Sequence, residues 1–533
     1  MSALTSITTT TRLLPLRLPR VCVAIVGDDA VEMIEKAEAV VRENPFFEFR
    51  LDYLKQPAAA LSKLKKFFDL HPEVIAIGTC RRAPNGGRFK GSVAAQIEVL
   101  SKAAAIGCQL VDIELETAEA LKASEFQRLH SRAAIVLSYH DFRSTKKLEE
   151  TFARMREFPA DFYKIVTTAT SLSDNVTMMK FLEQKSYTHS VIGLCMGEQG
   201  IISRVLALRA GSVFTFAAAN PGEETAPGQV SLRTLRDTYR IFQVDAATRV
   251  YGVAGDPVAH SLSPVMMNTA FRRENVNAVY LALHAKKLDD LLACIRNIPI
   301  SGVSVTMPYK QEIVPHLDNT DPLTAKVGAC NTVVRGADGR IFGFNTDVAG
   351  VVRPLERRLT LASSKILVIG AGGAARAAVF GLKERGADVY IINRTPANGQ
   401  KLAKLAKAKY LKRTDLKKYT FDCIINATPL GMEGAPKQSP LSEKEIRTKY
   451  AFDLVYSSPE TPFGKAAASA GATVISGGEM FVQQGARQFE IWTGKPAPAV
   501  EMQNVVDTEL AARAARKAAS KNGNDTHAKV RKS

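Results

Sequence analysis

The sequence has few cysteines and no regular spacing between them. Seven cysteines occur among 533 residues, and no two of them are separated by two residues as in a CxxC motif. A disulfide framework or a zinc site needs paired or closely spaced cysteines, so we expect neither, and a reducing compartment is indicated. The sequence also lacks an uninterrupted apolar run of about eighteen residues, so no membrane-spanning helix is expected. We therefore expect no bound metal and no membrane partner.

Acidic residues are scarce at both ends of the chain. Residues 1–20 contain three arginines and no acid, and residues 511–533 contain seven lysines and arginines against Asp525. These two ends carry half of the net charge of +18, and the remaining excess suits anionic small molecules. We expect residues 1–20 to be disordered, with a Ser/Thr-rich transit peptide as the alternative. Residues 510–533 are expected to form a basic disordered tail, with a nucleic-acid-binding arm as the alternative.

The first half of the sequence, residues 21–242, alternates short apolar runs with amphipathic stretches. Each apolar run is followed by a helical pattern or by a short connection. The runs lie at 21–27, 46–54, 74–80, 109–115, 134–140, 162–169, 190–197 and 213–218. Eight such strands with intervening helices predict a (β/α)8 barrel, and a doubly wound open sheet is the alternative.

A second α/β region begins after residues 243–249, where the pattern restarts with VYGVAG at 250–255. We expect residues 249–505 to form one domain whose two lobes flank a cleft. The expected parts are a substrate lobe at 250–350, a dinucleotide-binding lobe of the Rossmann type at 360–480, and a return to the substrate lobe at 481–505.

Lys164 lies inside the strand-like run FYKIVTTA, where its neighbours are apolar or small. Loss of hydration disfavours an ammonium there, and a neutral amine is what imine formation with a ketone requires. His140 ends the preceding run, so both side chains are expected at the carboxyl ends of the strands, where barrel enzymes have their active sites. A histidine beside an iminium can accept a proton from the adjacent carbon. A lysine that points to solvent at the rim is the alternative.

Charged residues in other segments also indicate a buried site. Glu48, Arg50 and Asp52 alternate in FEFRLDY, so they are expected on the strand face that points into the barrel. Arg204 follows MGEQGIIS and is suited to hold a carboxylate through two parallel hydrogen bonds. A loop containing TAPGQ comes after it and is expected to be mobile.

The motifs FEFRLDY, TCR, SYHDF, FYKIVTTA, MGEQGIISRV and TAPGQ resemble the type I 3-dehydroquinate dehydratases across residues 20–242. The resemblance implies that Lys164 forms an imine with the C3 ketone of 3-dehydroquinate and that His140 is the general acid and base, giving 3-dehydroshikimate. The substrate contacts that it implies are Glu48, Arg50, Arg81, Arg204, Thr225 and Gln229. The sequence departs from the family at Asn85, where glutamate is common, and at Thr225, where serine is frequent.

A glycine-rich turn, GAGGAARA at 370–377, follows the strand-like KILVI and opens a helical pattern. Glycines allow backbone N–H groups to approach a pyrophosphate at a helix N-terminus. The triplet NRT begins at residue 393, which is 23 residues after 370 and near the usual offset of about twenty for a ribose contact. Arg394 offers a cation to a 2′-phosphate, so NADP is favoured as the cofactor and NAD is the alternative.

Polar groups on loops of the preceding lobe suit a substrate. In HSLSP, Ser261 and Ser263 are two residues apart, so both hydroxyls can bind one carboxylate. The other candidates are Thr306 and Lys310 in SVTMPYK, Asn331 in GACNT and Asp347 in GFNTD. A lysine paired with an aspartate stays charged and can protonate a carbonyl oxygen during hydride delivery. A surface ion pair is the alternative.

The motifs YGVAGDPVAHSLSP, SVTMPYK, GACNT, GFNTD, GAGGAARA, NRT, NATPLGM and MFVQQGARQFEIWTG resemble the shikimate dehydrogenases throughout 250–505. The resemblance implies reversible reduction of 3-dehydroshikimate to shikimate by the catalytic pair Lys310 and Asp347. The implied substrate contacts are Ser261, Ser263, Thr306, Asn331, Tyr456 and Gln484. The implied NADP contacts are Gly370, Ala371, Gly372, Gly373, Ala374, Asn393, Arg394, Thr395, Leu454 and Gly477.

The product of the first expected reaction is the substrate of the second. We therefore expect a bifunctional shikimate-pathway enzyme with small-molecule partners, no nucleic-acid partner and a cytoplasmic location, or a plastid location if residues 1–20 belong to a transit peptide. The alternatives are a catalytically inactive quinate- or shikimate-sensing regulator and a second domain that prefers quinate. The presence of Lys164, His140, Lys310 and Asp347 argues against the regulator. The sequence leaves the oligomeric state open.

Overall fold

The computed structural model describes residues 17–259, 261–298, 300–432, 434–456 and 460–530. They form two compact units, one made of the described residues up to Arg249 together with Leu283–Ile298, and the other of Val250–Ala282 together with the described residues from 300 onward. Most of the segment that we expect to be disordered at the N-terminus, residues 1–16, lies outside the described residues. No helix in the described parts of the chain is long and apolar enough to cross a membrane.

The first unit contains an eight-stranded parallel sheet in which the order is β7-β6-β5-β4-β3-β2-β1-β8. Its strands are β1 (Val21–Ile25), β2 (Phe46–Arg50), β3 (Ile75–Thr79), β4 (Leu110–Glu114), β5 (Ala134–His140), β6 (Phe162–Thr168), β7 (Val191–Met196) and β8 (Thr215–Ala218). The backbone N–H of Val213, just before β8, donates to the carbonyl of Val191 at 2.9 Å, so the two ends of the sheet meet. The sheet is therefore a nearly closed barrel, which confirms the (β/α)8 prediction and excludes the open-sheet alternative.

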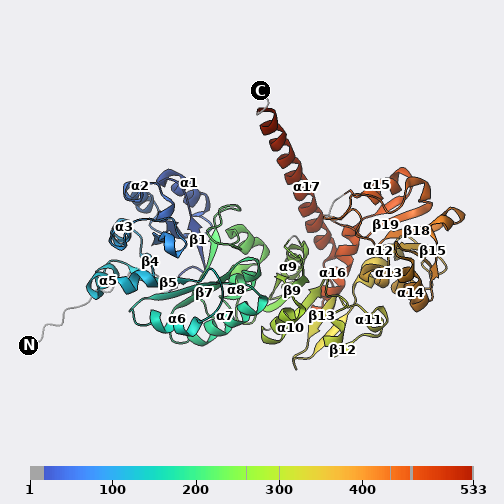
Figure 1. The fold of residues 1–533 in the computed structure, drawn as a ribbon, viewed down its shortest axis with the longest axis horizontal. Helices are drawn as coiled ribbons and strands as arrows, with labels where there is room; N and C mark the ends of the chain where they lie inside the picture. Colours follow the sequence, from blue (N-terminus) through green and yellow to red (C-terminus); the bar gives the residue numbers. More distant parts are fainter. Residues whose placement is uncertain (1–16, 260, 299, 433, 457–459, 531–533) are drawn as a thin grey trace, which may run out of the picture. The chain divides into compact units, whose positions relative to one another are not determined.

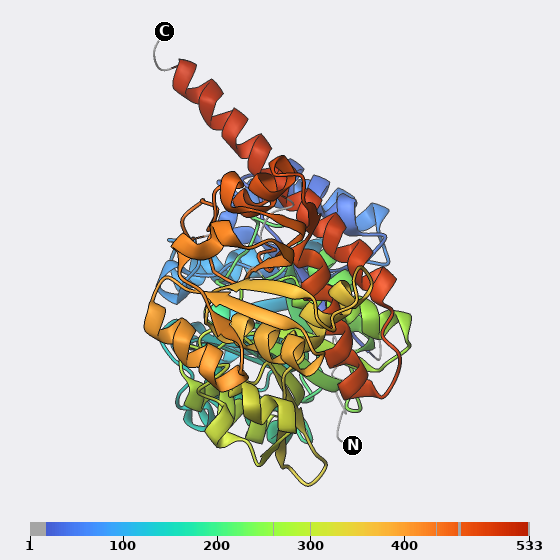
Figure 2. The ribbon, with the colours of Figure 1, turned by 90° about the vertical axis from the view of Figure 1, so that its right-hand side faces the viewer.

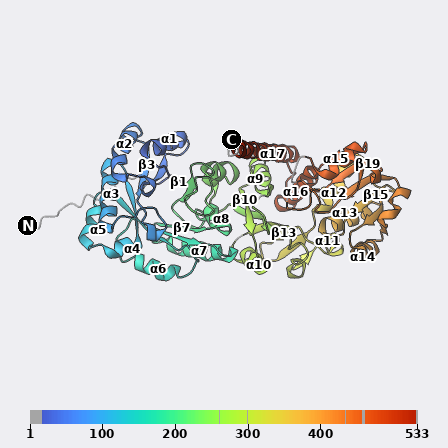
Figure 3. The ribbon, with the colours of Figure 1, turned by 45° about the horizontal axis from the view of Figure 1, so that its top comes forward.

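Helices surround the strands on the outside of this barrel (Figures 1 and 3). They are α1 (Ala30–Val40), α2 (Pro57–Leu70), α3 (Val93–Ile106), α4 (Leu115–Ala120), α5 (Ala123–His130), α6 (Leu148–Met155), α7 (Leu172–Lys185) and α8 (Ile201–Leu206). Each strand thus has both faces covered, which explains why the strands read as nearly continuous apolar runs in the sequence.

The barrel interior has an apolar floor below a charged layer. Phe46, Leu110 and Val136 are buried together in the floor. Two residues further along the same strands, at Glu48, Asp112 and Ser138, the side chains that point inward are polar and buried. Strand β2 ends at Arg50, so the prediction of a strand through residue 54 is wrong: Asp52 lies in a 3₁₀ turn at Leu51–Tyr53. In this turn the Asp52 carboxylate accepts a hydrogen bond from Arg50.

The second unit contains two six-stranded sheets. The first has the order β10-β9-β11-β13-β14-β12 and mixes parallel and antiparallel neighbours. Its strands are β9 (Arg249–Gly255), β10 (Ala278–His284), β11 (Ile300–Val305), β12 (Asn319–Thr320), β13 (Thr332–Arg335) and β14 (Ile341–Phe344). The helices that accompany it are α9 (Ser263–Arg273), α11 (Pro322–Val327) and α12 (Asp347–Glu356), whereas α10 (Leu288–Asn297) belongs to the first unit.

The other sheet of the second unit is entirely parallel, with the order β17-β16-β15-β18-β19-β20. Its strands are β15 (Lys365–Ile369), β16 (Asp388–Ile392), β17 (Lys409–Tyr410), β18 (Phe421–Asn426), β19 (Thr448–Asp453) and β20 (Thr473–Ile475). Helices α13 (Gly373–Glu384), α14 (Pro396–Ala406) and α15 (Pro462–Ser469) connect them. This doubly wound order has its switch point between β15 and β18, where nucleotides bind in such sheets. The predicted lobe of the Rossmann type is confirmed.

Two long helices end the second unit. Helix α16 (Gly477–Thr493) packs its apolar side chains into the core of the substrate lobe. Helix α17 (Ala499–Val530) follows, and its last turns project from the unit (Figures 1 and 2). Residues 510–530, which we expect to be a disordered tail, continue this helix in the structure, whereas 531–533 lie outside the described residues. The buried side chains of Met502 and Val506 anchor the helix, and the Ala- and Lys/Arg-rich sequence beyond them favours its continuation.

Candidate active sites

Lys164 is buried in the charged layer of the barrel, opposite Ser138 in the register of β5 and β6. Its Nζ lies 3.2 Å from Glu48 Oε1, 3.1 Å from Asp112 Oδ2 and 4.0 Å from the centre of the Phe216 ring. The lysine therefore points into the barrel rather than to solvent. The prediction that its surroundings are apolar or small is wrong, because its immediate strand neighbours face outward and two carboxylates from other strands contact its Nζ.

His140 lies at the carboxyl end of β5 and contacts Arg81. The Arg81 guanidinium lies against the imidazole, with Nη1 2.6 Å from Nδ1, and the Phe142 ring is stacked on the imidazole at 6.1 Å. Burial, followed by the positive charges of Arg81, Lys164 and Arg50, lowers the pKa of His140 well below its usual value. At neutral pH the imidazole is therefore neutral and can accept a proton.

Two more arginines of the predicted set are buried at the same end of the barrel. Arg50 donates to both carboxylate oxygens of Asp52, at 2.9 and 2.8 Å. Arg204 is 1% exposed; its Nη2 donates to the Pro227 carbonyl at 2.9 Å, and its Nε has no partner within the described structure. Burial lowers the pKa of Arg204 to about 10. A buried arginine with an unused N–H is suited to an anionic ligand such as a carboxylate.

The TAPGQ loop is joined to this arginine through Pro227. Thr225 donates from both its backbone N and its Oγ1 to Gln229 Oε1, at 2.7 and 3.1 Å. The hydroxyl and the amide that were predicted as substrate contacts therefore lie together. They share the loop whose carbonyl Arg204 holds.

Asn85 lies in the turn Ala83–Asn85 after β3, near the residues that contact His140. The following Gly86 has φ of +78°, and a Cβ there would lie 2.1 Å from the Phe142 ring. A Cβ on Gly87 would lie 2.0 Å from the Arg81 carbonyl oxygen. Both glycines are thus required by close packing. No hydrogen bond joins Asn85 to His140 among the described residues, where the imidazole contacts Arg81.

Sequence reasoning missed Asp112, which joins Lys164 to Arg81. Besides its contact with Lys164, its Oδ1 accepts hydrogen bonds of 2.7 Å from Arg81 Nη2 and from Ser138 Oγ. The available signal was an acid in the middle of an apolar strand, QLVDIEL.

The second unit holds its reactive pair where its two lobes meet. Lys310 follows β11 and Asp347 begins α12, and Lys310 Nζ lies 2.5 Å from Asp347 Oδ2. Asn331 Nδ2 donates to Asp347 Oδ1 at 2.8 Å and lies 3.4 Å from Gln484 Oε1 on α16. The structure therefore brings these four predicted residues together from separate segments of the chain.

The other predicted substrate residues lie in the same unit. The backbone N–H of Ser263 donates to Ser261 Oγ at 3.2 Å, so the two serines lie side by side as predicted. Tyr456 is stacked on Phe481 at 4.6 Å, and burial, followed by the charge of Asp347, raises its pKa. Thr306 follows β11, and its backbone N–H donates to the Ala254 carbonyl. His260, in the same motif as the serines, lies outside the described residues.

Gln488 was not predicted from the sequence, although it fixes the backbone around Asn331. Its Nε2 donates to the Asn331 carbonyl at 3.2 Å and to Thr332 Oγ1 at 3.0 Å, and its Oε1 accepts from Ser304 at 2.7 Å. It lies four residues after Gln484, on the same face of α16.

The glycine-rich turn after β15 leaves an open cradle at the start of α13. Gly370 has φ of +121°, and a Cβ there would lie 2.9 Å from the Ala427 carbonyl oxygen. A Cβ on Gly372 would meet nothing within 4 Å, and no side chain caps the first turn of α13. A Cβ on Gly373 would lie 3.9 Å from Lys310 Cδ, so the turn adjoins the reactive pair.

The remaining predicted cofactor residues follow at the carboxyl ends of neighbouring strands. Asn393 Nδ2 donates to the Thr395 carbonyl at 2.9 Å, and the exposed Arg394 lies between them just before α14. Leu454 follows β19, and Gly477 begins α16, where a Cβ would lie 2.4 Å from the Val455 carbonyl oxygen.

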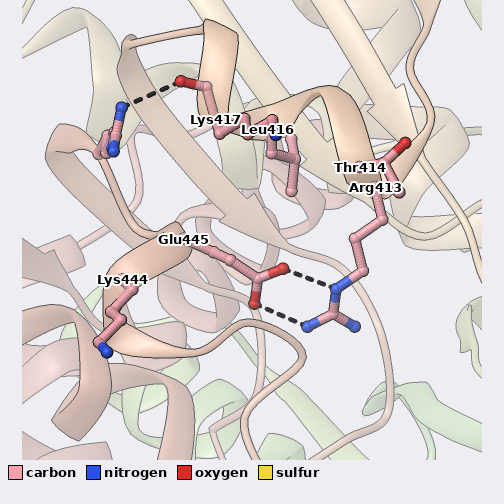
Figure 4. Close-up of a pocket in the computed structure, with 7 residues that line it drawn as sticks. Arg413, Thr414, Leu416, Lys417, Lys444 and Glu445 are labelled. Atoms are coloured by element: carbon pink, nitrogen blue, oxygen red, sulfur yellow. Dashed lines mark hydrogen bonds and ion pairs between the residues drawn. The ribbon is translucent and has the colours of Figure 1, made fainter.

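A pocket of about 230 Å³ lies at the opposite edge of this sheet, beside the amino ends of β18 and β19. Arg413 and Glu445 face each other in it through two hydrogen bonds of 2.8 Å, and Arg447 donates to the Lys417 carbonyl (Figure 4). These groups satisfy one another, and no predicted site residue lines the pocket. It is therefore not the reaction site.

The chain matches four family models. Residues 21–246 match type I 3-dehydroquinase, and residues 253–333 match the shikimate dehydrogenase substrate binding domain. Residues 355–432 match shikimate / quinate 5-dehydrogenase, and residues 477–506 match the shikimate 5′-dehydrogenase C-terminal domain.

Three relatives illustrate the similarity. The chloroplastic bifunctional 3-dehydroquinate dehydratase/shikimate dehydrogenase of Arabidopsis thaliana is 34% identical over 502 residues, which cover 90% of this chain and 82% of that protein. Shikimate biosynthesis protein AroDE of Chlamydia pneumoniae is 31% identical over 69% of this chain and 75% of its own length. Shikimate dehydrogenase (NADP(+)) of Syntrophobacter fumaroxidans is 40% identical over 47% of this chain and 89% of its own length.

Proposed function

The chain belongs to the family of bifunctional 3-dehydroquinate dehydratase/shikimate dehydrogenases, and on that premise we propose which of its residues perform the two reactions. It is a lyase and an oxidoreductase of the shikimate pathway. The barrel dehydrates 3-dehydroquinate to 3-dehydroshikimate, and the second unit reduces 3-dehydroshikimate to shikimate. The comparisons give no support to the alternative of a regulator.

Lys164 is the proposed imine-forming residue of the barrel. The observation that carries this assignment is a buried Nζ, within reach of two carboxylates and above an aromatic ring, at the end of the barrel where such enzymes react. The iminium draws electrons from the adjacent carbon and makes its proton acidic. Neutral His140 accepts that proton and returns it to the leaving hydroxyl, which departs as water.

Arg204 is the proposed partner of the substrate carboxylate. Its unused Nε, its burial and its contact with the TAPGQ loop support this role. Glu48, Arg50, Arg81, Thr225 and Gln229 complete the proposed substrate contacts. Because Thr225 and Gln229 now satisfy each other, they are expected to exchange that bond for bonds to substrate.

The second unit fits NADP. The open cradle at Gly372, the uncapped first turn of α13 and the exposed Arg394 are what a pyrophosphate and a 2′-phosphate require. Gly370 to Ala374, Asn393 to Thr395, Leu454 and Gly477 would hold the cofactor, which supplies the hydride when bound. NADP is also the cofactor in the name of the bacterial relative from Syntrophobacter.

Lys310 is the proposed proton donor to the substrate oxygen in the second reaction. Asp347 orients its ammonium at 2.5 Å, and Asn331 orients Asp347 in turn. Ser261, Ser263, Thr306, Tyr456 and Gln484 are the proposed remaining substrate contacts. The assignment is supported by the contact of Gln484 with Asn331, by the charge of Asp347 acting on Tyr456, and by the glycine turn beside Lys310.

We further propose 21–242 and 249–505 as the limits of the two functional domains. All seven cysteines are buried and free, which supports the proposal of a reducing compartment such as the cytoplasm. The proposed partners are small molecules.

One spectroscopic assay tests the function. With 3-dehydroquinate and NADPH, the absorbance of a conjugated enone is expected to rise first, followed by consumption of NADPH. Lys164→Met is expected to abolish both signals from 3-dehydroquinate while leaving NADPH consumption with 3-dehydroshikimate unchanged. Borohydride with 3-dehydroquinate is expected to leave a covalent adduct on Lys164. Dehydration without an adduct would refute the imine assignment.

A further inference from the structure

Asp112 is a buried carboxylate of the barrel interior that accepts three hydrogen bonds. It is 1% exposed and accepts from Lys164 Nζ at 3.1 Å, from Arg81 Nη2 at 2.7 Å and from Ser138 Oγ at 2.7 Å. Two of these three donors are cations. The carboxylate thus lies between the imine-forming lysine and the arginine that contacts His140.

The two carboxylates beside Lys164 differ in what else they bind. Glu48 Oε1 accepts from Lys164 and from the neutral hydroxyl of Thr79 at 3.0 Å. Asp112 also faces the Arg81 guanidinium. Although burial alone would raise the pKa of Asp112, the charges of Arg81 and Lys164 and the Ser138 hydrogen bond lower it below its usual value. The cations beside Asp112 therefore favour its ionised form, whereas the second donor to Glu48 is a neutral hydroxyl.

Imine formation conserves the charge at Nζ. The ammonium and the ketone give an iminium and water: the C–O double bond is replaced by a C–N double bond, two of the three ammonium protons leave with the oxygen as water, and one stays on nitrogen. A carboxylate that pairs the ammonium is therefore placed to pair the iminium.

We propose that Asp112 is the permanent counter-ion of the Lys164 imine and, by holding Arg81 against His140, also positions the general base. The proposal rests on the assignment of Lys164 and His140 made above. An iminium without a counter-ion in a buried site loses its proton readily, and a neutral imine is a much weaker electron sink. Asp112 thus keeps the intermediate in its reactive form while the Arg81 cation keeps the imidazole neutral.

Other ionisable groups face Asp112 from the surrounding strands. They are Lys164 on β6, Arg81 after β3, Glu48 on β2 on the far side of Lys164, and the Cys22 thiol on β1. Burial, followed by the charge of Glu48, raises the pKa of Cys22, so the thiol stays neutral. In Asp112→Asn, Glu48 is left as the one carboxylate within hydrogen-bond distance of Nζ among the described side chains.

The test is the substitution Asp112→Asn in the full chain, which removes the charge and keeps the shape. We expect dehydration to fall by about 10²–10³-fold, as for other losses of electrostatic stabilisation at a reacting group. The alkaline limit of both turnover and borohydride trapping is expected to move to lower pH, because the unpaired iminium deprotonates more easily. Asp112→Glu keeps the charge, so it is expected to restore the alkaline limit.

A structural role for Asp112 would lower the rate without moving the pH profile. The proposal is overturned if Asp112→Asn keeps the wild-type alkaline limit, or if the Asn and Glu variants have the same profile. If thermal melting shows that the Asn variant does not fold, Ser138→Ala is the deciding variant. It removes one of the three hydrogen bonds that Asp112 accepts and leaves the charge of Asp112 unchanged. A smaller shift of the alkaline limit in the same direction supports the proposal, and an unchanged limit overturns it. Absence of an adduct in the wild-type chain would instead refute the proposed function.

Discussion

Substituting Asp347 by asparagine removes the negative charge beside Lys310 with almost no change in shape. The two charged atoms are 2.5 Å apart, for which Coulomb's law at an effective dielectric constant of about 20 gives about 7 kcal/mol. The Lys310 side chain is 21% exposed, so water and local relaxation recover part of this energy. We take about 2–4 kcal/mol as the net loss, because removal of one partner of a fully buried pair costs about 3–5 kcal/mol.

That loss applies to the step in which Lys310 orients and protonates the substrate oxygen. At about 1.4 kcal/mol per tenfold change, it slows turnover in the reduction of the 3-keto substrate by about 30- to 1,000-fold. The affinity for NADPH is expected to stay the same, because the glycine turn and the Asn393–Thr395 segment keep all their groups. The carbonyl oxygen of an asparagine at 347 can still accept from Asn331, so the fold is expected to be retained.

The assay follows NADPH consumption with saturating 3-dehydroshikimate, and a fluorescence titration gives the NADPH affinity. Enone formation from 3-dehydroquinate in the same preparation is an internal control and is expected to be unchanged. Asp415→Asn is a matched control, because it breaks an exposed lysine–aspartate pair, Lys418–Asp415 at 2.8 Å, far from the reactive residues in sequence. Wild-type turnover in Asp347→Asn, or an equal fall in both Asn variants, would refute the reasoning.

Three further predictions concern the barrel base and the core of the second unit. Because burial and the charge of Arg81 lower the pKa of His140, dehydration is expected to persist below pH 6.5, the usual pKa of histidine. In Arg81→Gln the pKa of His140 rises, so the acid limit of dehydration is expected at a higher pH than in wild type. A pH–rate profile with the same acid limit in both proteins would contradict this. Gly302→Ala is expected to destabilise the second unit by about 1–3 kcal/mol and to shift the emission of Trp492, the only tryptophan, because the new Cβ would lie 2.4 Å from its Nε1. Unchanged melting and emission would show that the indole moves aside at no cost. Met502→Ala is expected to lower the free energy of unfolding by about 2–5 kcal/mol, since Met502 is fully buried and anchors α17; a chemical denaturation curve like that of wild type would count against this anchoring.

The sequence by itself determined the elements and the faces on which the reactive groups lie. Alternation with a period of two places Glu48 and Arg50 on the inner face of β2, and a lysine inside an apolar run could be placed on a strand directly. The glycine-rich turn and the NRT triplet follow strands at characteristic spacings, so the Rossmann-type lobe could be predicted from local pattern alone. Such signals are local because each depends on the conformation of a few consecutive residues.

Only the tertiary structure decided which groups pair. Lys164 meets Asp112 across 52 positions of sequence, and Asn331 meets Gln484 across 153. Within one strand, a pattern specifies the face but not the partner, because the partner depends on register, on closure of the barrel and on how α16 returns to the substrate lobe. For the same reason the surroundings of Lys164 were wrongly predicted to be apolar: its strand neighbours face outward, and the two carboxylates come from β2 and β4.

The C-terminal helix shows the same division. The composition of residues 510–530 suggested a disordered tail, because a charged, polar segment has little apolar surface to bury. Its helical state depends on Met502 and Val506, which pack into the core of the substrate lobe and begin a helix that alanines and long basic side chains then continue. Composition could therefore determine that the segment lacks a core of its own, and only the packed fold decided that a neighbouring core supplies the start of its helix.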